Sequence, residues 1–393
     1  MARRTPHLAS RLQGLGATIF ATMSQLATET GSINLGQGFP DTDGPAEIAE
    51  AAVEAIRAGH NQYPPGTGIP ALRHAVADHQ REFWGLDYDP QSEVLVTAGA
   101  TEAMAAAILA LCEVGDEVVA FEPFYDAYAA VVAMAGASLI PVELRAPDWS
   151  FDEADLASAI SPRTRAIILN SPHNPTGKVF SRDELAVIAK ICVEADLIAL
   201  TDEVYEHMVF SGEHLPLAGF PGMRQRTIAI SSAAKTYSFT GWKIGWVTAT
   251  PELVSAVRTT KQFLTYVNGA PFQVAVAHAL EAGRLLTDLA PSGIAPQRAT
   301  LIEGLDADGL AVLPSEGTYF LTTDITPVTS MGAARFCTWM AHNIGVVAVP
   351  ASAFYATPGK GDSLVRWTFC KRPEVIEQAV ERLAKLRQMA TKP

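Results

Sequence analysis

The sequence has few cysteines, few charged residues and no apolar run long enough to cross a membrane. Its four cysteines lie far apart in 393 residues and form no C-x-x-C pair, so neither a zinc site nor a disulfide framework is predicted. No uninterrupted apolar stretch approaches the ~20 residues that a membrane-spanning helix needs. The charged N-terminal residues precede no apolar segment, so we expect no secretory signal. These absences predict a protein of a reducing, cytoplasmic compartment, with no metal site and no membrane partner.

The charge balance is acidic. Only 18% of the residues are charged and 48% are hydrophobic, with a formal net charge of −13. Such a composition supports a large buried core and disfavours disorder. The negative charge argues against nucleic acid and anionic membranes as partners. The length suits two domains, or one large domain with a smaller one.

From residue 93 onward, apolar segments typical of β-strands alternate with segments typical of helices. These segments lack the polar alternation of a half-exposed strand, as expected when helices cover both faces of a sheet. The fold class predicted is therefore α/β, with a doubly wound, mostly parallel sheet. The predicted strands are Val94–Val96, Glu117–Phe121, Ala137–Val142, Ala166–Leu169, Leu197–Leu200, Thr227–Ile230 and Ile244–Val247.

The two ends of the chain follow a different pattern. After about residue 285, short strands and flanking helices predict a smaller α+β domain. We expect residues 1–44 to pack with that domain and residues 45–284 to form the large one, with 285–393 as the small one. Helices are predicted over 8–30, 45–58, 70–84, 101–112 and 124–135.

A lysine just past a buried strand is the strongest chemical signal. Lys235 follows the strand at 227–230 and precedes a glycine-bearing turn with a second lysine, Lys243. Burial lowers the pKa of an amine and makes it a nucleophile. Ser232 and Lys243 could hold an anion beside it. A reactive amine next to a phosphate site is what a pyridoxal phosphate enzyme needs, because the amine binds the aldehyde and the anion site binds the phosphate.

Other polar residues end neighbouring strands, where open α/β sheets bind ligands. Asp202 is placed to pair with the pyridine nitrogen, while Asn174 and Tyr205 can contact the phenolic oxygen. Tyr125 or the adjacent Phe124 can stack on the ring. The predicted phosphate donors are Ala100 and Thr101 at a helix N-terminus, with Ser232 and Lys243.

An arginine within an apolar strand requires an anionic partner. Arg366 occupies such a position, and either a substrate carboxylate or a structural ion pair would satisfy it.

Two other classes of protein are disfavoured. A dinucleotide enzyme would carry G-x-G-x-x-G, which is absent, and a cofactor-sensing regulator would need a basic DNA-binding extension.

Taken together, four motifs make the chain resemble the class I/II aminotransferases, which are pyridoxal phosphate enzymes of fold type I. The motifs are Asn174-Pro-Thr-Gly, Asp202-Glu-Val-Tyr205, Ser231-Ser-x-x-Lys235 and Gly241-Trp-Lys-Ile-Gly. Further segments are similar to the kynurenine/glutamine transaminases, the bacterial methionine aminotransferases and the actinobacterial N-succinyldiaminopimelate aminotransferases. Ala233-Ala-Lys235, Gly269-Ala-Pro-Phe-Gln273 and Thr368-Phe-Cys-Lys-Arg372 are most similar to the last group.

The resemblance assigns roles to residues of this chain. It implies that Lys235 binds the cofactor aldehyde and moves the substrate α-proton, and that Arg366, Gly36 and Asn174 bind the substrate carboxylate. It also implies a homodimer with shared sites, in which Tyr63 reaches the partner's cofactor and Tyr266 lines the partner's pocket. Phe20 is expected at the rim that receives the substrate side chain.

The resemblance implies a two-step amino transfer between an amino acid and a 2-oxo acid. The substrate pair expected is N-succinyl-LL-2,6-diaminopimelate with 2-oxoglutarate/glutamate, in lysine biosynthesis. The alternatives are a kynurenine, glutamine or methionine aminotransferase and a carbon–sulfur β-lyase or aminocyclopropane-carboxylate synthase on the same scaffold.

Overall fold

The computed structural model describes residues 7–13, 15–283 and 289–386. Its largest element among these residues is a seven-stranded sheet with strand order β2-β8-β7-β6-β5-β3-β4. Neighbouring strands run parallel except that β8 is antiparallel to both β2 and β7, so the prediction of a mostly parallel sheet is confirmed. The strands are β2 (Val94–Thr97), β3 (Glu117–Glu122), β4 (Ser138–Glu143), β5 (Thr164–Asn170), β6 (Ile198–Asp202), β7 (Thr227–Ser232) and β8 (Gly245–Thr248).

Both faces of this sheet are buried except along the edge strand β4, which is mostly half-buried, and this burial explains the unbroken apolar runs. Val118 and Ala120 of β3 pack into one core, whereas Val119 and Phe121 pack into the core on the opposite face. Burial of alternate side chains on opposite faces removes the need for polar positions. The surrounding helices are α2 (Ala46–Arg57), α3 (Pro70–Trp84), α4 (Gly99–Leu111), α5 (Ala127–Ala135), α6 (Glu153–Ser158), α7 (Arg182–Glu194), α8 (Ala233–Thr236), α9 (Pro251–Leu264) and α10 (Ala270–Glu281).

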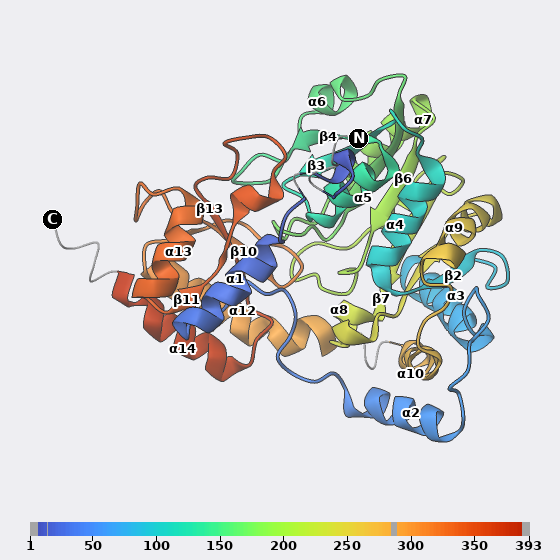
Figure 1. The fold of residues 1–393 in the computed structure, drawn as a ribbon, viewed down its shortest axis with the longest axis horizontal. Helices are drawn as coiled ribbons and strands as arrows, with labels where there is room; N and C mark the ends of the chain where they lie inside the picture. Colours follow the sequence, from blue (N-terminus) through green and yellow to red (C-terminus); the bar gives the residue numbers. More distant parts are fainter. Residues whose placement is uncertain (1–6, 14, 284–288, 387–393) are drawn as a thin grey trace.

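A smaller α+β part contains the C-terminal residues and the N-terminal helix. Its antiparallel sheet has the order β12-β13-β10-β9, and a separate pair joins β1 to β11 in parallel. Figure 1 shows α1, in blue, beside the orange helix α13, against which it packs. The elements are α1 (Ile19–Thr30), β1 (Ile33–Asn34), α12 (Leu289–Ala307), β9 (Ala311–Val312), β10 (Phe320–Asp324), α13 (Ala333–Asn343), β11 (Val346–Val347), β12 (Val349–Pro350), β13 (Leu364–Thr368) and α14 (Pro373–Leu383).

The pairing of β1 with β11 joins the N-terminal segment to the small part. The grouping of residues 1–44 with the small domain stays a prediction. The boundaries at 44/45 and 284/285 stay predictions, and the second lies at residues outside the described ranges.

Among the described residues, every helix is too short or too polar to cross a bilayer. All four cysteines are buried free thiols.

Two predicted helix boundaries were wrong. The expected helix over 8–30 begins only at Ile19, because Thr18 is extended and its hydroxyl accepts a hydrogen bond from the Ala21 N–H, which is an N-cap. A short 3-10 turn, Ser10–Leu12, precedes it. The helix expected from residue 124 begins at Ala127, since the preceding residues form the turn that leaves β3.

Candidate active site

Lys235 lies in the short helix α8, directly beyond the end of β7. Its Nζ donates to the Gly38 carbonyl at 3.3 Å and lies 5.6 Å from the Tyr319 ring and 5.8 Å from the Tyr205 ring. Burial lowers the pKa of the Lys235 amine to about 8, although the negative charge of Asp202 opposes that shift. The amine is therefore partly neutral near physiological pH, as a nucleophile must be.

This pKa gives a direct expectation for the cofactor-free protein. The lowered pKa means that Lys235 loses its proton as the pH rises through about 8, whereas an ordinary lysine does so near 10.5. Its acetylation by a trace of acetic anhydride, followed by peptide mass spectrometry, should rise to a plateau with a midpoint near pH 8. The exposed Lys190 of α7 is the control. A midpoint for Lys235 near 10.5 would contradict the buried amine.

Asp202 is buried at the carboxyl end of β6 and faces the same space. Tyr128 of α5 donates its hydroxyl to Asp202 Oδ2 at 2.6 Å. Burial raises the pKa of the Asp202 carboxyl, while the Tyr128 hydrogen bond and the nearby charge of Lys235 act in the opposite direction. Asn170, at the end of β5, donates to the Asp202 carbonyl at 2.8 Å and fixes the strand end.

Tyr128 is a site residue to which the sequence reasoning assigned no role. It lies three residues after Tyr125, and the two rings contact each other edge-on with 5.9 Å between their centres. We expect Tyr128→Phe to weaken cofactor binding about tenfold, since a hydrogen bond to a charged group contributes about 1.5–3 kcal/mol. Dilution of the loaded protein with absorbance detection measures that affinity.

Tyr88→Phe is the matched control for this substitution. Tyr88 is also buried, but it does not line the cavity that Tyr128 faces. If the two variants lose cofactor affinity equally, the Tyr128–Asp202 bond has no special role.

Arg366 is 1% exposed within β13. Its Nη1 donates to Asn174 Oδ1 at 3.0 Å and its Nη2 to the Gly36 carbonyl at 2.7 Å. The structural ion pair that sequence reasoning left open does not occur among the described residues, where no carboxylate lies within 4 Å of the guanidinium. Arg366 Nε is buried and meets no acceptor in that same part of the chain. Because a buried guanidinium needs an anion, the site is suited to a carboxylate ligand.

Aromatic rings surround the same guanidinium. Its central carbon lies 4.0 Å from the Phe320 ring centre, 4.9 Å from that of Phe354 and 5.1 Å from that of Phe20. Burial lowers the pKa of Arg366 to about 10. The guanidinium remains charged at neutral pH. It is surrounded by apolar rings that exclude water, and the low dielectric constant there strengthens its attraction for an anion.

Two glycines shape the turn at the start of α4. Gly99 has φ +75°, and a Cβ there would lie 3.2 Å from Lys243 Nζ. A Cβ on Gly245 would lie 2.7 Å from the Gly99 carbonyl carbon. The absence of both side chains lets β8 and Lys243 approach the first N–H groups of α4. Backbone N–H groups, the helix dipole and an ammonium together form an anion site.

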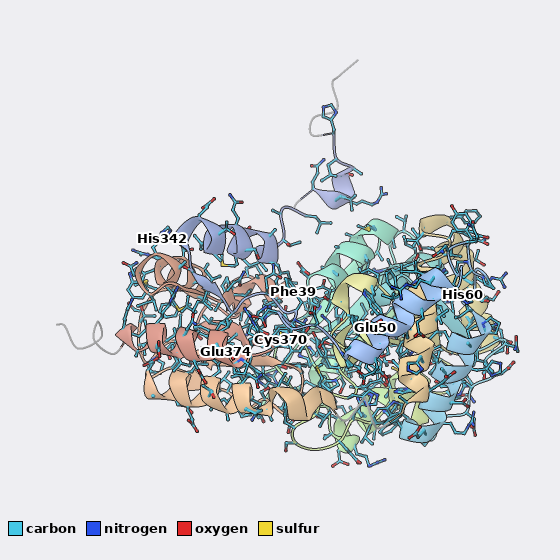
Figure 2. All side chains as sticks on the ribbon, turned by 90° about the horizontal axis from the view of Figure 1, so that it is seen from below. Phe39, Glu50, His60, His342, Cys370 and Glu374 are labelled. Atoms are coloured by element: carbon cyan, nitrogen blue, oxygen red, sulfur yellow. The ribbon has the colours of Figure 1, made fainter. Side chains whose placement is uncertain are left out.

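These groups surround one cavity of about 300 Å³. Phe39, which Figure 2 shows beside Cys370 at the junction of the two parts, also lines it. Cys370 itself is buried and burial raises the pKa of its thiol, so it is not a reactive cysteine. The predicted site residues that line the cavity are Phe20, Ala100, Thr101, Tyr125, Asn174, Asp202, Tyr205, Ser232, Lys235, Lys243 and Arg366.

Four predicted site residues lie outside this lining. Phe124, the alternative to Tyr125 for covering the ring, is buried in a hydrophobic core. Gly36 borders the cavity through its carbonyl, which holds Arg366. Tyr63 and Tyr266 are 82% and 50% exposed and contact each other edge-on at 5.7 Å between ring centres. Sequence reasoning also missed the Gly38 carbonyl, which accepts hydrogen bonds from Lys235 and from the Tyr319 hydroxyl at 2.6 Å. No local pattern identifies such a carbonyl.

Residues 30–383 match the family described as aminotransferase class I and II. The chain belongs to this family. It is 51% identical over 390 residues to a probable N-succinyldiaminopimelate aminotransferase of Mycobacterium tuberculosis, covering 96% of this chain and 98% of the relative. It is 39% identical to the methionine aminotransferase of Escherichia coli, covering 96% and 98%, and 36% identical to human kynurenine–oxoglutarate transaminase 1, covering 96% and 97%.

Solved structures agree with the sequence comparisons. The structure of the Mycobacterium tuberculosis N-succinyldiaminopimelate aminotransferase matches with a TM-score of 0.94, covering 96% of this chain and all of that one. A single mutant of the Thermus thermophilus aspartate aminotransferase matches at 30% identity with a TM-score of 0.90, covering 98% of this chain and all of that one. This aminotransferase therefore has fold type I and uses pyridoxal phosphate, as the sequence predicted.

The cavity of this aminotransferase fits that cofactor. Its donor set combines a buried carboxylate, a lysine with a lowered pKa and an anion site at the start of α4. When bound, pyridoxal phosphate supplies an electron-accepting ring that stabilises negative charge at the substrate α-carbon. The protein has to orient the reacting groups, hold the charges and move a proton.

Proposed function

We propose that this aminotransferase moves an amino group between N-succinyl-LL-2,6-diaminopimelate and the 2-oxoglutarate/glutamate pair, in lysine biosynthesis. The observation that carries this proposal is the 51% identity to the probable N-succinyldiaminopimelate aminotransferase across 96% of the chain. The buried Arg366 also supports the proposal, because its free Nε–H can bind the α-carboxylate of an amino acid.

Each cofactor contact is proposed from the position of the side chain in the cavity. Asp202 would pair with the ring nitrogen, and its charge would keep that nitrogen protonated. Asn174 and Tyr205 would contact the phenolic oxygen, and Tyr125 would cover the ring face. Ala100 and Thr101 would bind the phosphate through the start of α4, together with Ser232 and Lys243.

The substrate contacts follow from the same geometry. Arg366 would hold the substrate carboxylate, with Asn174 and the Gly36 region beside it. The α-carbon would then lie toward Lys235, whose Nζ would take the α-proton and later return it; the pKa of about 8 allows the neutral amine to act as a base. Phe20, packed over Arg366, would form part of the rim that receives the side chain.

We propose further that the enzyme is a homodimer with shared sites. Tyr63 and Tyr266 are large, exposed and outside their own cavity, and Phe263, three residues before Tyr266, is also exposed. An apolar surface of this kind is typical of a protein interface. Tyr63 would reach the partner's cofactor and Tyr266 would line the partner's pocket. The four free thiols support a cytoplasmic location, because the cytoplasm keeps thiols reduced.

A comparison of amino donors tests the substrate. We expect kcat/KM with N-succinyl-LL-2,6-diaminopimelate to exceed that with methionine, kynurenine or glutamine by more than about tenfold, the discrimination available when a side chain fills its pocket. 2-Oxoglutarate is the acceptor, and glutamate formation is measured. A faster reaction with methionine or kynurenine would favour the alternative suggested by the relatives at 39% and 36% identity. Pyruvate and ammonia from a cysteine conjugate would indicate a β-lyase.

A further inference from the structure

Tyr266 has a strained backbone at an exposed position. It lies between α9 and α10 with φ +64°, a left-handed conformation that costs a non-glycine residue about 1–2 kcal/mol. Its ring is half exposed and contacts Tyr63, which lies in the loop between α2 and α3. Strain of this kind persists only where the surroundings hold it, and it is often found at functional positions.

Lys261, in the last turn of α9, holds this conformation. The residue is 2% exposed, and its Nζ donates to the Tyr266 carbonyl at 2.6 Å and to the Gly66 carbonyl at 3.3 Å. Burial lowers the pKa of the Lys261 amine, which the nearby carboxylate of Glu102 opposes. One buried amine therefore connects the loop that bears Tyr63 with the segment that bears Tyr266.

The same segment is bonded to the proposed phosphate site. Glu102, in the first turn of α4, accepts from the Ala98 N–H at 2.5 Å and also from the Thr265 hydroxyl. Asn268 Nδ2 donates to the Thr97 carbonyl at 2.8 Å and to the Lys243 carbonyl at 3.0 Å. Residues 265–268 are thus fixed to the frame of their own subunit's site, whereas Tyr63 and Tyr266 are exposed and are not part of that site's lining.

We propose that Lys261 is a positioning residue for the partner subunit's active site, because it fixes Tyr63, proposed to reach that site's cofactor, and Tyr266, proposed to line its pocket. Thr265 has the same role through its bond to Glu102. This inference rests on the shared-site dimer of the proposed function. Lys261 neither lines the cavity of its own subunit nor bonds the start of α4, so the effect of Lys261→Met should appear only across the interface.

Mixed dimers of two differently tagged copies separate the two subunits' contributions. One copy carries Lys235→Ala, so that only the other copy has a working site. Lys261→Met is then placed either in the copy with Lys235→Ala or in the working copy, and the mixed dimer without it is the reference. We expect KM for the amino donor to rise about fivefold to tenfold, with kcat nearly unchanged, only when Lys261→Met is in the non-working copy.

Three results would overturn the proposal: an equal rise in both arrangements, a rise only when Lys261→Met is in the working copy, or no rise in either. Thr265→Val, which keeps the shape of the side chain and removes its hydroxyl, should reproduce the pattern if Lys261→Met folds poorly. The Lys261→Met homodimer should also dissociate at concentrations about tenfold higher in sedimentation experiments. A wild-type protein that is monomeric at assay concentration would instead contradict the dimer itself, and sedimentation of the wild type shows this before any mixed dimer is made.

Discussion

Replacing Lys235 by alanine is expected to lower kcat by at least about 10⁴-fold, because the substitution removes both the nucleophile and the group that moves the α-proton. The side chain is not a structural support: its Nζ makes one hydrogen bond, to the Gly38 carbonyl at 3.3 Å, among the residues described. The variant should fold and keep its cavity. Steady-state rates with glutamate and 2-oxoglutarate measure the loss.

Two further measurements make the Lys235 prediction specific. The variant should still bind pyridoxal phosphate through the anion site, but borohydride should no longer attach the cofactor covalently to the chain. Lys190→Ala, which removes an exposed lysine paired with Glu153, should have no effect on either property. Residual activity within about tenfold of wild type would show that another group carries out the proton transfer.

Replacing Asp202 by asparagine should have the second largest effect. The substitution keeps an oxygen that can accept from Tyr128 but removes the buried negative charge. Breaking a buried charge pair costs about 3–5 kcal/mol, so we expect kcat/KM to fall about 10³-fold. The cofactor absorption should change as well, because the ring nitrogen loses the charge that keeps it protonated.

Glu203→Gln is the matched control for Asp202→Asn. Glu203 is the next residue and is equally buried, but its carboxylate bonds Thr201 and His214 instead of facing the cavity. Glu203→Gln should affect the free energy of unfolding more than the rate. If Glu203→Gln lowers the rate as much as Asp202→Asn does, then the rate depends on negative charge anywhere near β6 and not on a contact between Asp202 and the cofactor.

The large sheet could be predicted from sequence because its signal is local. Each strand is a short apolar run with small or polar residues at its end, and the burial of both faces by helices removes any polar alternation. The same locality identified Lys235, Asp202 and Ser232, since each ends or follows a strand. The carboxyl ends of parallel strands meet at one edge, which brings these residues together.

What the sequence could not predict depends on contacts between distant residues. Gly38 lies 197 positions from Lys235 and 281 from Tyr319, yet its carbonyl contacts both. The Tyr128–Asp202 bond spans 74 positions. From the sequence alone, Lys261 resembles an ordinary surface lysine of an amphipathic helix. Only the structure shows that it is buried and bonded to two backbone carbonyls. Periodicity describes the neighbours of a residue along the chain and not those across the fold.

The absorption spectrum of the purified enzyme tests the central claim most directly. With bound pyridoxal phosphate the account predicts a visible band, which an amino donor moves to the near ultraviolet as the cofactor takes up the amino group and which 2-oxoglutarate then restores. N-succinyl-LL-2,6-diaminopimelate should cause the fastest change. A protein that stays colourless with added pyridoxal phosphate would contradict the assignment of this cavity as an aminotransferase site, provided that a cooperative unfolding transition shows the protein to be folded.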